Sequence, residues 1–339
     1  MKVFFVKSSR KVLSIMRNSS SLDGSFCAVN MLKSSKGTGY KALARQTKVR
    51  ICSPESIVCN YVAVDVRSRL FKYVREISKI RNTKRKIRCV FGLLLQGINS
   101  EIRRVCDEAL EKMMAEVSII GAEKVKYVFC SPERCPYRER LRLSDRILEK
   151  AKAKERFTKA LSKCKKHILK VSIMIECHNA FVGYVIAHIE EVCLIYNSII
   201  SGNATVMPDH EDSYESDRLC ARISDNVEGG RYGVVLSEDY DCTFLFGAKK
   251  MIRKITKYAV QYVTIKDAIK VFECNDRQSL VYKCCLMGTD YNLGLKGIGP
   301  KKASATNNEH ILAEECMKQQ CIDIRELMKF FLLDDISEF

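Results

Sequence analysis

The sequence predicts an α/β protein built on a mainly parallel central sheet with helices on both faces. Residues 60–77 begin as an apolar strand, pass Asp65 and continue as a helix with a one-sided apolar pattern. A second helical pattern spans 101–118 and leads into a second strand at 124–131. Strands that alternate with helices in this way indicate a parallel sheet. With 339 residues, the chain can form one large domain or two ordinary ones.

Composition divides the chain into four segments. Residues 1–36 are rich in Ser and Lys without a clear period, which predicts an extension of little order. Residues 37–131 contain the strand–helix–strand unit described above. The densely charged segment 132–210 predicts basic helices followed by an insertion. The remaining segment, 211–339, contains a further strand and further helices.

The excess of positive charge predicts a polyanionic partner. Lys and Arg number 58 against 40 Asp and Glu, and nucleic acid is the first candidate at a formal net charge of +18. The basic run 79–88 is either a solvated loop or a patch for phosphate or nuclear import. The twelve Lys and Arg side chains of 138–166 exceed what solubility needs, and they favour phosphate contact. A merely basic surface is the alternative for both.

Cysteine usage predicts an intracellular protein. The chain has 17 cysteines, no secretion signal and no pair of CxxC motifs at zinc-site spacing, so reduced thiols are expected. Residues 181–200 are apolar, but His188, Glu190 and Glu191 interrupt them. A membrane span would not carry these polar groups in its middle, so this segment predicts a buried helix.

Acidic side chains recur where predicted strands and helices begin or end. The stretch "GVVLSEDYDCTFLFG" (233–247) places Asp239 and Asp241 directly after an apolar strand. Other acids stand at similar places: Asp65, Glu215, Asp217 and Asp290. The carboxyl ends of parallel strands meet at one edge of a sheet, where α/β proteins gather their sites. Any one acid is more simply a helix cap or a surface charge. Together they predict a site for Mg²⁺, two ions of which can hold the reacting oxygens of a phosphodiester.

A glycine-rich turn follows the last of these acids. In "LVYKCCLMGTDYNLGLKGIGPKKAS" (280–304) an apolar helix ends near Met287, and three glycines precede a proline and two lysines. Proline suits the first position of a helix. Glycines before a helix let backbone N–H groups approach a phosphate, so this turn predicts an anion contact.

Five stretches together resemble the XPG/flap endonuclease family of 5′ nucleases. The helix and turn "CLMGTDYNLGLKGIGPKKA" resembles the helix–two-turn–helix signature of that family, and "SEDYDCTFLFG" resembles its internal motif. The others are "YVAVDVRSRLF", "ESDRLCA" and "ERFTKALSKCKKHILKVSIMI". The matches follow the family's order from about residue 37 to 304. The resemblance implies the PIN-like 5′ nuclease fold, with N-terminal (37–131) and internal (211–339) nuclease regions and a helical arch within 132–210. The compact length would suit a divergent viral member.

The resemblance implies roles for particular residues. The implied ligands of two Mg²⁺ ions, which Mn²⁺ can replace, are Asp65, Glu215, Asp217, Asp239, Asp241 and Asp290. Arg138 and Arg146 are similar in position to the family's gateway pair, which stabilises charge in the transition state, and Arg140 and Arg142 are rivals for that place. The turn that grips duplex DNA, with a K⁺ ion, would include Gly297, Gly299, Lys301 and Lys302. Phe71 is either an aromatic that stacks on a base or a core residue.

One departure from the family's pattern concerns catalysis. Cys130 and Ser131 stand where the family has Asp and Gly, and that Asp is a metal ligand. A thiol is a poor ligand for Mg²⁺. Glu133 is a candidate replacement. The alternative to an active enzyme is therefore a catalytically impaired homologue that binds nucleic acid.

The expected function is that of a monomeric, structure-specific 5′ nuclease. It would hydrolyse branched, nicked or flapped DNA by two-metal catalysis, in replication, repair or recombination. The nucleus is the expected location, or the host nucleus or viral factory for a viral protein. The stretch "IRELMKFF" (324–331) resembles a sliding-clamp-binding peptide, but a closing core helix is favoured.

Overall fold

The computed structural model describes most of the chain beyond its first segment. The described residues are 39–57, 59, 61–78, 82–122, 124–129, 140–168, 170–189, 191–192, 205–206, 215–225, 233–292, 294–299, 302–303 and 324–332. The predicted extension, residues 1–36, lies outside them.

A seven-stranded sheet in the order β1-β7-β6-β5-β2-β3-β4 forms the centre of the fold. The strands are β1 (Arg50–Cys52), β2 (Tyr61–Asp65), β3 (Lys124–Val128), β4 (Thr205–Val206), β5 (Gly233–Leu236), β6 (Lys250–Ile255) and β7 (Val260–Thr264). From β6 to β4 every neighbouring pair is parallel, whereas β7 is antiparallel to both β6 and β1. The prediction of a mainly parallel sheet is confirmed, and the antiparallel edge is an addition to it.

The register of the two central strands positions the acids. β2 pairs with β5 from Tyr61 opposite Gly233 to Val64 opposite Leu236. Asp65 therefore ends β2 beside the point where β5 gives way to the acidic stretch. Val62–Val64 and Val234–Leu236 are fully buried. Strands that are buried on both faces consist of continuous apolar residues, which explains why these two lie at the centre.

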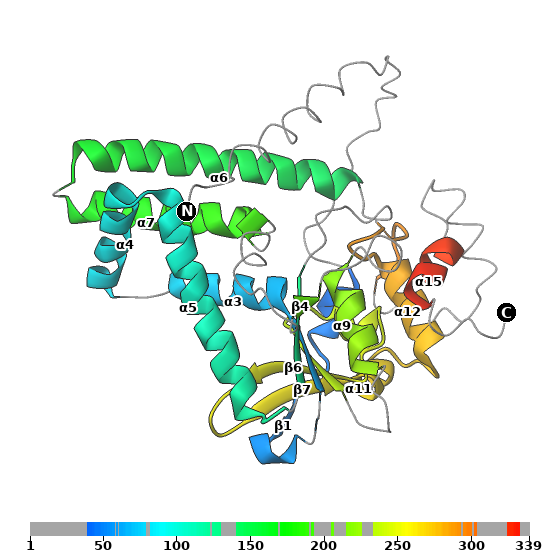
Figure 1. Cartoon of the computed structure of the whole chain (residues 1–339). Helices are drawn as coiled ribbons and strands as arrows, with labels where there is room; N and C mark the ends of the chain where they lie inside the picture. Colours follow the sequence, from blue (N-terminus) through cyan, green and yellow to red (C-terminus); the bar gives the residue numbers. More distant parts are fainter. Residues whose placement is uncertain are drawn as a thin grey trace. The chain divides into compact units, whose positions relative to one another are not determined.

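Helices cover both faces of the sheet (Figure 1). Val62 and Val64 pack into a core that includes α3 (Val66–Ser78), α5 (Ile98–Ile119) and α7 (Val171–Ala187). Ala63 and Val235 point to the other face, whose core includes α9 (Ser216–Asp225), α10 (Asp241–Phe244), α11 (Ile265–Val271), α12 (Arg277–Met287) and α15 (Ile324–Leu332). This alternation of side chains along each strand separates the two cores. The shorter elements α2 (Tyr40–Ala44) and η1 (Pro54–Ser56) complete the N-terminal part.

Two long helices carry much of the basic segment. α6 (Arg140–Lys166) and α7 lie alongside each other, and α7 also packs on α3 and α4 (Thr83–Leu95) (Figure 1). The pair is held by aromatic contacts such as Phe157 with Phe181, whose ring centroids are 5.5 Å apart. The predicted burial of 181–200 is confirmed for its described helical part, where Phe181, Val182 and Val185 are buried. Among the described residues, no helix is long and apolar enough to cross a membrane.

The structure corrects one of the two alternatives for the basic run 79–88, the solvated loop. α4 begins at Thr83, and the side chain of Asn82 accepts a hydrogen bond from the backbone N–H of Arg85, at 3.2 Å. Asn is a favoured N-cap because its side-chain oxygen satisfies one of the unpaired N–H groups at a helix start. From its N-cap at Asn82 onwards, the run is therefore the first part of α4. The sequence analysis did not predict this helix, because the many lysines and arginines are also typical of a loop.

The last described helix belongs to the core, as the sequence favoured. Leu327, Phe330 and Phe331 of α15 are buried. The ring of Phe331 lies 5.2 Å from that of Tyr291 and 5.5 Å from that of Phe246. These side chains fill the space beside α12, so binding to a sliding clamp through them remains only a prediction.

Candidate metal centre

Acids from three elements meet at one edge of the sheet. Asp65 ends β2, Asp217 lies in the first turn of α9, and Asp239 and Asp241 follow β5. Carboxylate oxygens of Asp217, Asp239 and Asp241 lie within 4.8 Å of one another, and so do the ligand atoms of Asp65, Asp217 and Cys242. Asp217 belongs to both groups and joins them into one continuous site.

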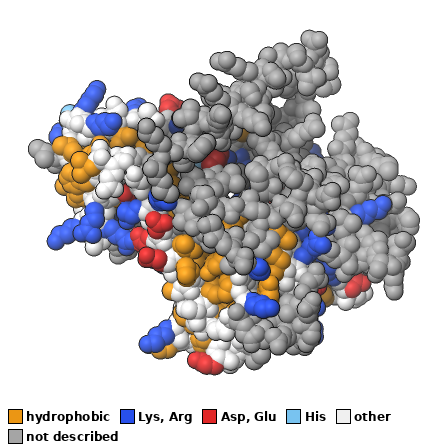
Figure 2. Space-filling model, in the orientation of Figure 1, with side chains coloured by type: hydrophobic (Ala, Val, Ile, Leu, Met, Phe, Trp, Pro, Cys, Tyr) orange, Lys and Arg blue, Asp and Glu red, His pale blue; other side chains and the backbone are white. Residues whose placement is uncertain are grey.

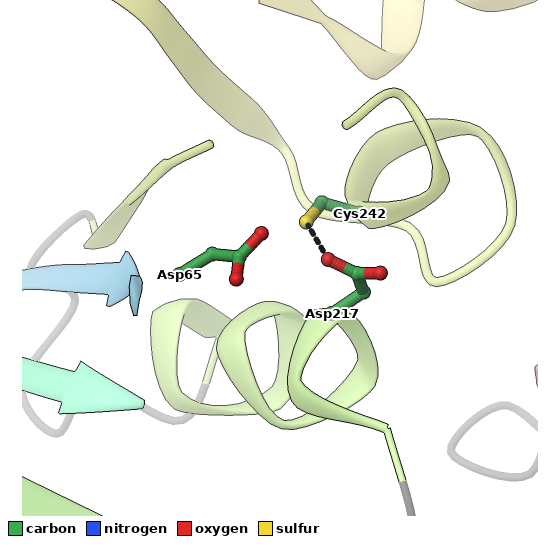
Figure 3. Close-up of side chains that lie close together, drawn as sticks. All are labelled: Asp65, Asp217 and Cys242. Atoms are coloured by element: carbon green, nitrogen blue, oxygen red, sulfur yellow. Dashed lines mark hydrogen bonds between the residues drawn. The ribbon is translucent and has the colours of Figure 1, made fainter. Parts of the chain in front are cut away.

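We call Asp65, Asp217 and Cys242 the inner cluster (Figure 3). The three side chains point toward one another, and the Cys242 thiol donates to Asp217 Oδ1 at 3.3 Å. Asp65 accepts hydrogen bonds from the Ser237 hydroxyl at 2.8 Å and from the Ser68 N–H at 3.2 Å. Burial raises the pKa of Asp65 despite these bonds. Burial, then Asp65 and Asp239, raise the pKa of Asp217 well above its ordinary value.

We call Asp239, Asp241 and Asp290 the outer cluster. The ammonium of Lys41 lies 3.0 Å from Asp239, 3.1 Å from Asp241 and 3.4 Å from Asp290. The hydroxyl of Tyr40 also donates to Asp241. Burial and then Asp290 raise the pKa of Asp241 well above its ordinary value. Burial lowers the pKa of Lys41, but Asp239 and Asp290 outweigh it and leave that pKa raised.

Glu215 stands close behind this arrangement. It is buried directly before α9 and contributes to the raised pKa of Asp217. Glu215 does not belong to either of the two groups whose ligand atoms lie within 4.8 Å of one another. The structure thus brings Asp65, Asp217, Asp239 and Asp241 together and places Glu215 and Asp290 at the margin.

The donor set fits a hard divalent cation. Burial first, and then repulsion between neighbouring carboxylates, raise the pKa values of Asp65, Asp217 and Asp241, and a cation between the carboxylates would relieve that repulsion. Carboxylate oxygens are the preferred ligands of Mg²⁺ and Mn²⁺, whereas a thiol is not. Asp217 and Asp239 with either Asp65 or Asp241 therefore offer such an ion suitable oxygens. Cys242 contributes a hydrogen bond rather than a ligand.

A buried ionic network supports the acidic stretch. The guanidinium of Arg69 is fully buried and forms ion pairs with Glu116 and with Glu238, the latter at 3.4 Å. It also donates to the backbone oxygen of Arg253 at 2.9 Å. From the same helix, the Ser68 hydroxyl accepts a hydrogen bond from the Glu238 N–H at 2.8 Å. Helix α3 therefore fixes the residue that precedes Asp239. The sequence reasoning missed Arg69, although its place beside Leu70 in an otherwise apolar stripe was a usable signal.

The predicted DNA-contacting residues are spread over several elements. Phe71 is 37% exposed on α3, with the Arg75 guanidinium 5.9 Å from its ring centroid, so the core alternative for Phe71 is wrong. Arg146 is half-buried on α6. Gly297 has a φ of +83°, a conformation that favours glycine. Lys302 is exposed in the short helical stretch that follows Gly299. Five predicted positions lie outside the described residues or side chains: Cys130, Arg138, Arg140, Arg142 and Lys301.

A basic pocket lies where the sequence offered a phosphate patch. It has a volume of ≈ 430 Å³ and lies at the start of α4. Its lining consists of Asn82, Lys84, Arg85, Arg88, Cys89 and Arg104. Figure 2 shows Lys and Arg side chains gathered at the left, over the part of the molecule that contains α4, α6 and α7. Arg85 and Arg104 also form ion pairs with acids, so part of this charge is already balanced.

Comparison with known proteins identifies the acidic region independently. Residues 208–290 match the XPG I-region. A flap endonuclease 1 of Methanobrevibacter smithii is 33% identical over 118 residues, which cover 33% of this chain and 36% of that protein. A flap endonuclease 1 of Methanococcus aeolicus is 40% identical over 92 residues, covering 26% and 27% of the two chains. The chain thus spans about a third of the length of the curated relatives it matches.

Two solved structures give weaker matches that cover most of the chain. The flap endonuclease-1 of Methanococcus jannaschii is 17% identical, with a TM-score of 0.45, and the match covers 85% of this chain and 83% of that one. The catalytic core of Rad2 in complex with DNA substrate is 16% identical, with a TM-score of 0.43 and coverages of 86% and 82%. At the sequence level the part of the chain that carries Glu215, Asp217, Asp239, Asp241 and Asp290 is thus similar to the XPG I-region, and about a third of the chain is similar to flap endonucleases.

Proposed function

We propose that the protein is a metal-dependent nuclease that hydrolyses phosphodiester bonds in branched, nicked or flapped DNA. The observation that carries the proposal is the meeting of Asp65, Asp217, Asp239 and Asp241 at one edge of the sheet. Asp65, Asp217 and Asp241 are buried, and buried carboxylates this close together are costly unless a proton or a cation compensates them. The curated relatives named flap endonuclease 1 support a 5′ flap as the first substrate to test.

The acids would hold Mg²⁺, or Mn²⁺ in its place. When bound, such an ion polarises a phosphate oxygen and lowers the pKa of a bound water, which supplies the nucleophile. Asp217, which belongs to both groups of ligand atoms, would contact an ion bound in either group. Asp65 and Asp241 are placed to fix the two sides of the site, because each is itself held by hydrogen bonds. Glu215 and Asp290 would act at the margin.

Several surfaces would hold the DNA. The basic face of α6, the pocket at the start of α4 and the turn at Gly297 offer positive charge or backbone N–H groups for phosphates. The exposed ring of Phe71 is available to stack on an unpaired base. We propose that Arg146, half-exposed on α6, contributes to charge stabilisation near the cut. A K⁺ ion at the Gly297 turn remains a prediction.

A cleavage assay tests the proposal. Wild-type protein and Asp239→Ala are incubated with a labelled 5′ flap in Mg²⁺ and, separately, in Mn²⁺. Asp239 is partly exposed, so its loss should leave the fold intact. We expect the variant to cleave at least about 100-fold more slowly, or roughly 2.7 kcal/mol of barrier. Cleavage by the wild type that does not exceed that of Asp239→Ala would refute the proposal.

A second candidate function is DNA binding without cleavage. It is favoured by Cys130, which stands where the family has an Asp metal ligand, although Cys130 lies outside the described residues. β3 ends at Val128, which pairs with Asp65, so the family's missing ligand belongs to the strand next to the acids. This candidate predicts binding to flapped DNA that needs no divalent ion and survives Asp239→Ala.

A further inference from the structure

The outer cluster already contains a positive charge of its own. Lys41 forms ion pairs with Asp239, Asp241 and Asp290, at 3.0, 3.1 and 3.4 Å. Among the described residues, the structure gives such pairs with all three acids for Lys41 alone. An ammonium group has three N–H donors and no acceptor, so three carboxylates can satisfy it completely. Its side chain remains 30% exposed, so the cluster stays open to solvent on the side of Lys41.

The backbone around Lys41 is fixed rather than free to move aside. The Tyr40 N–H donates to the Gly288 oxygen at 3.3 Å, and the fully buried Tyr40 ring packs on Phe244 with centroids 6.1 Å apart. A Cβ atom at Gly39 would lie 2.6 Å from the Gly288 oxygen, so only glycine allows this close approach. The start of α2 is thereby wedged against the end of α12, and Lys41 follows immediately.

The inner cluster is held by different groups. Asp65 is bound by a hydroxyl and a backbone N–H, and Asp217 by a thiol. These donors are neutral, and within the described residues the charge of Arg67 acts on Asp217 as well, but no ammonium holds Asp65 and Asp217 at ion-pair distance in the way that Lys41 holds the outer acids. A divalent ion in the inner cluster would be surrounded by carboxylate oxygens. In the outer cluster the Lys41 ammonium already contacts the carboxylate oxygens that such an ion would need.

We propose that the Lys41 ammonium occupies one of the two cation positions of this site, so that the protein binds a single divalent ion, at the inner cluster. The proposal rests on the metal-dependent function proposed above and replaces the expected pair of ions with one ion and one lysine. Lys41 would then be the positive charge that faces the second side of a bound phosphate. Because it is covalently attached, this charge would not depend on metal concentration.

Counting bound Mn²⁺ by electron paramagnetic resonance tests the proposal without DNA or catalysis. The full-length protein is titrated with Mn²⁺, and the number of bound ions and their magnetic coupling are measured. We expect wild type to bind one ion with the spectrum of an isolated Mn²⁺. Lys41→Met keeps the length of the side chain but removes the charge, and we expect it to bind two ions whose spectra are broadened by coupling between them.

Two variants control this measurement. Lys41→Arg keeps the charge and should bind one ion, as the wild type does. Lys249→Met removes a lysine that forms an ion pair with Asp225, at 2.6 Å, and with no acid of either cluster in the ion pairs that the described residues show. This variant should also bind one ion. Two coupled ions in the wild type, or an unchanged single ion in Lys41→Met, would overturn the proposal while leaving the metal-dependent function intact. Conversely, one bound Mn²⁺ without cleavage of the flap would refute the proposed function alone. No binding by the wild type would refute both.

Discussion

The inner and outer clusters solve the same electrostatic problem in different ways. Both gather buried or half-buried aspartates at the carboxyl edge of β2 and β5. In the outer cluster an ammonium lies at ion-pair distance from the carboxylates, whereas the hydrogen bonds that the described residues give to the inner cluster come from neutral donors. The difference shows that a row of similar acids need not be a row of equivalent metal ligands, because the groups opposite each acid decide what it can bind.

The largest expected effect concerns the metal-free protein and pH. Burial raises the pKa values of Asp65, Asp217 and Asp241, so the folded state binds protons more tightly than the unfolded state. This contribution to stability is complete below the ordinary pKa of 3.8 and is lost as the pH rises through the raised values. We therefore expect the Tm in EDTA to fall as the pH rises above 3.8 and through the raised pKa values of these three acids.

Saturating Mn²⁺ should remove most of this slope, because the ion replaces the proton between the carboxylates. Asp217→Asn, which deletes the acid that belongs to both groups of ligand atoms, should flatten the slope in EDTA. Differential scanning fluorimetry measures both. A metal-free Tm that rises over this pH range would contradict the raised pKa values of Asp65, Asp217 and Asp241.

Arg69→Met is expected to disturb the acidic stretch after β5, because Arg69 pairs with Glu238, directly before Asp239. The change leaves Glu116 and Glu238 without their buried partner, and such a loss typically destabilises by about 3–5 kcal/mol. Urea unfolding measures it. The matched control is Lys72→Met, since Lys72 contacts the same two acids at 3.3 and 3.5 Å but is less buried. If the control costs as much as Arg69→Met, Arg69 has no special place in holding the acidic stretch.

Asp217→Asn should weaken Mn²⁺ binding more than any change confined to the outer cluster. Asp217 is shared by both groups of ligand atoms, so its loss should lower affinity by at least about 100-fold, or roughly 2.7 kcal/mol. Asp290→Asn, at the margin, should lower it by about tenfold or less. Isothermal titration calorimetry distinguishes them. Equal losses would mean that the two clusters are not distinct.

Cys130→Asp is expected to have the smallest effect, an increase in Mn²⁺ affinity of about tenfold or less. It restores the carboxylate that the family carries after the strand next to Asp65. The same variant in the flap assay decides between the two candidate functions. A large gain in cleavage would show that the wild-type site is impaired, and unchanged cleavage would show that the site works without this ligand.

The central strands and the acid edge were predictable because their signals are local. Three consecutive apolar residues followed by acids identify a buried strand that ends at a site, as at Val234–Leu236. The antiparallel pairing of β6 and β7 was not predicted, because a partner is chosen by tertiary contacts rather than by the strand's own pattern. The N-cap at Asn82 was missed because the surrounding charge resembled a loop.

Lys41 was missed for a related reason. It lies on a helix of only five residues, too short for any periodic pattern, and its partners are about 200 and 250 positions further along the chain. Nothing adjacent to it in the sequence indicates a cluster of acids. Arg69 likewise derives its role from Glu116 and Glu238 on other elements. Residue type and spacing identified the ligands, whereas the charges opposite them required the folded chain.

The close approach of Gly39 to the backbone oxygen of Gly288 has a consequence for the interpretation of motifs in similar proteins. Because it places one lysine against the outer acids, a single codon in a short helix outside every acidic motif would set how many ions the site accepts. Two chains with identical acidic motifs could then differ in their metal requirement. An inventory of the acidic motifs would count the possible ligands correctly and still give the wrong number of bound ions.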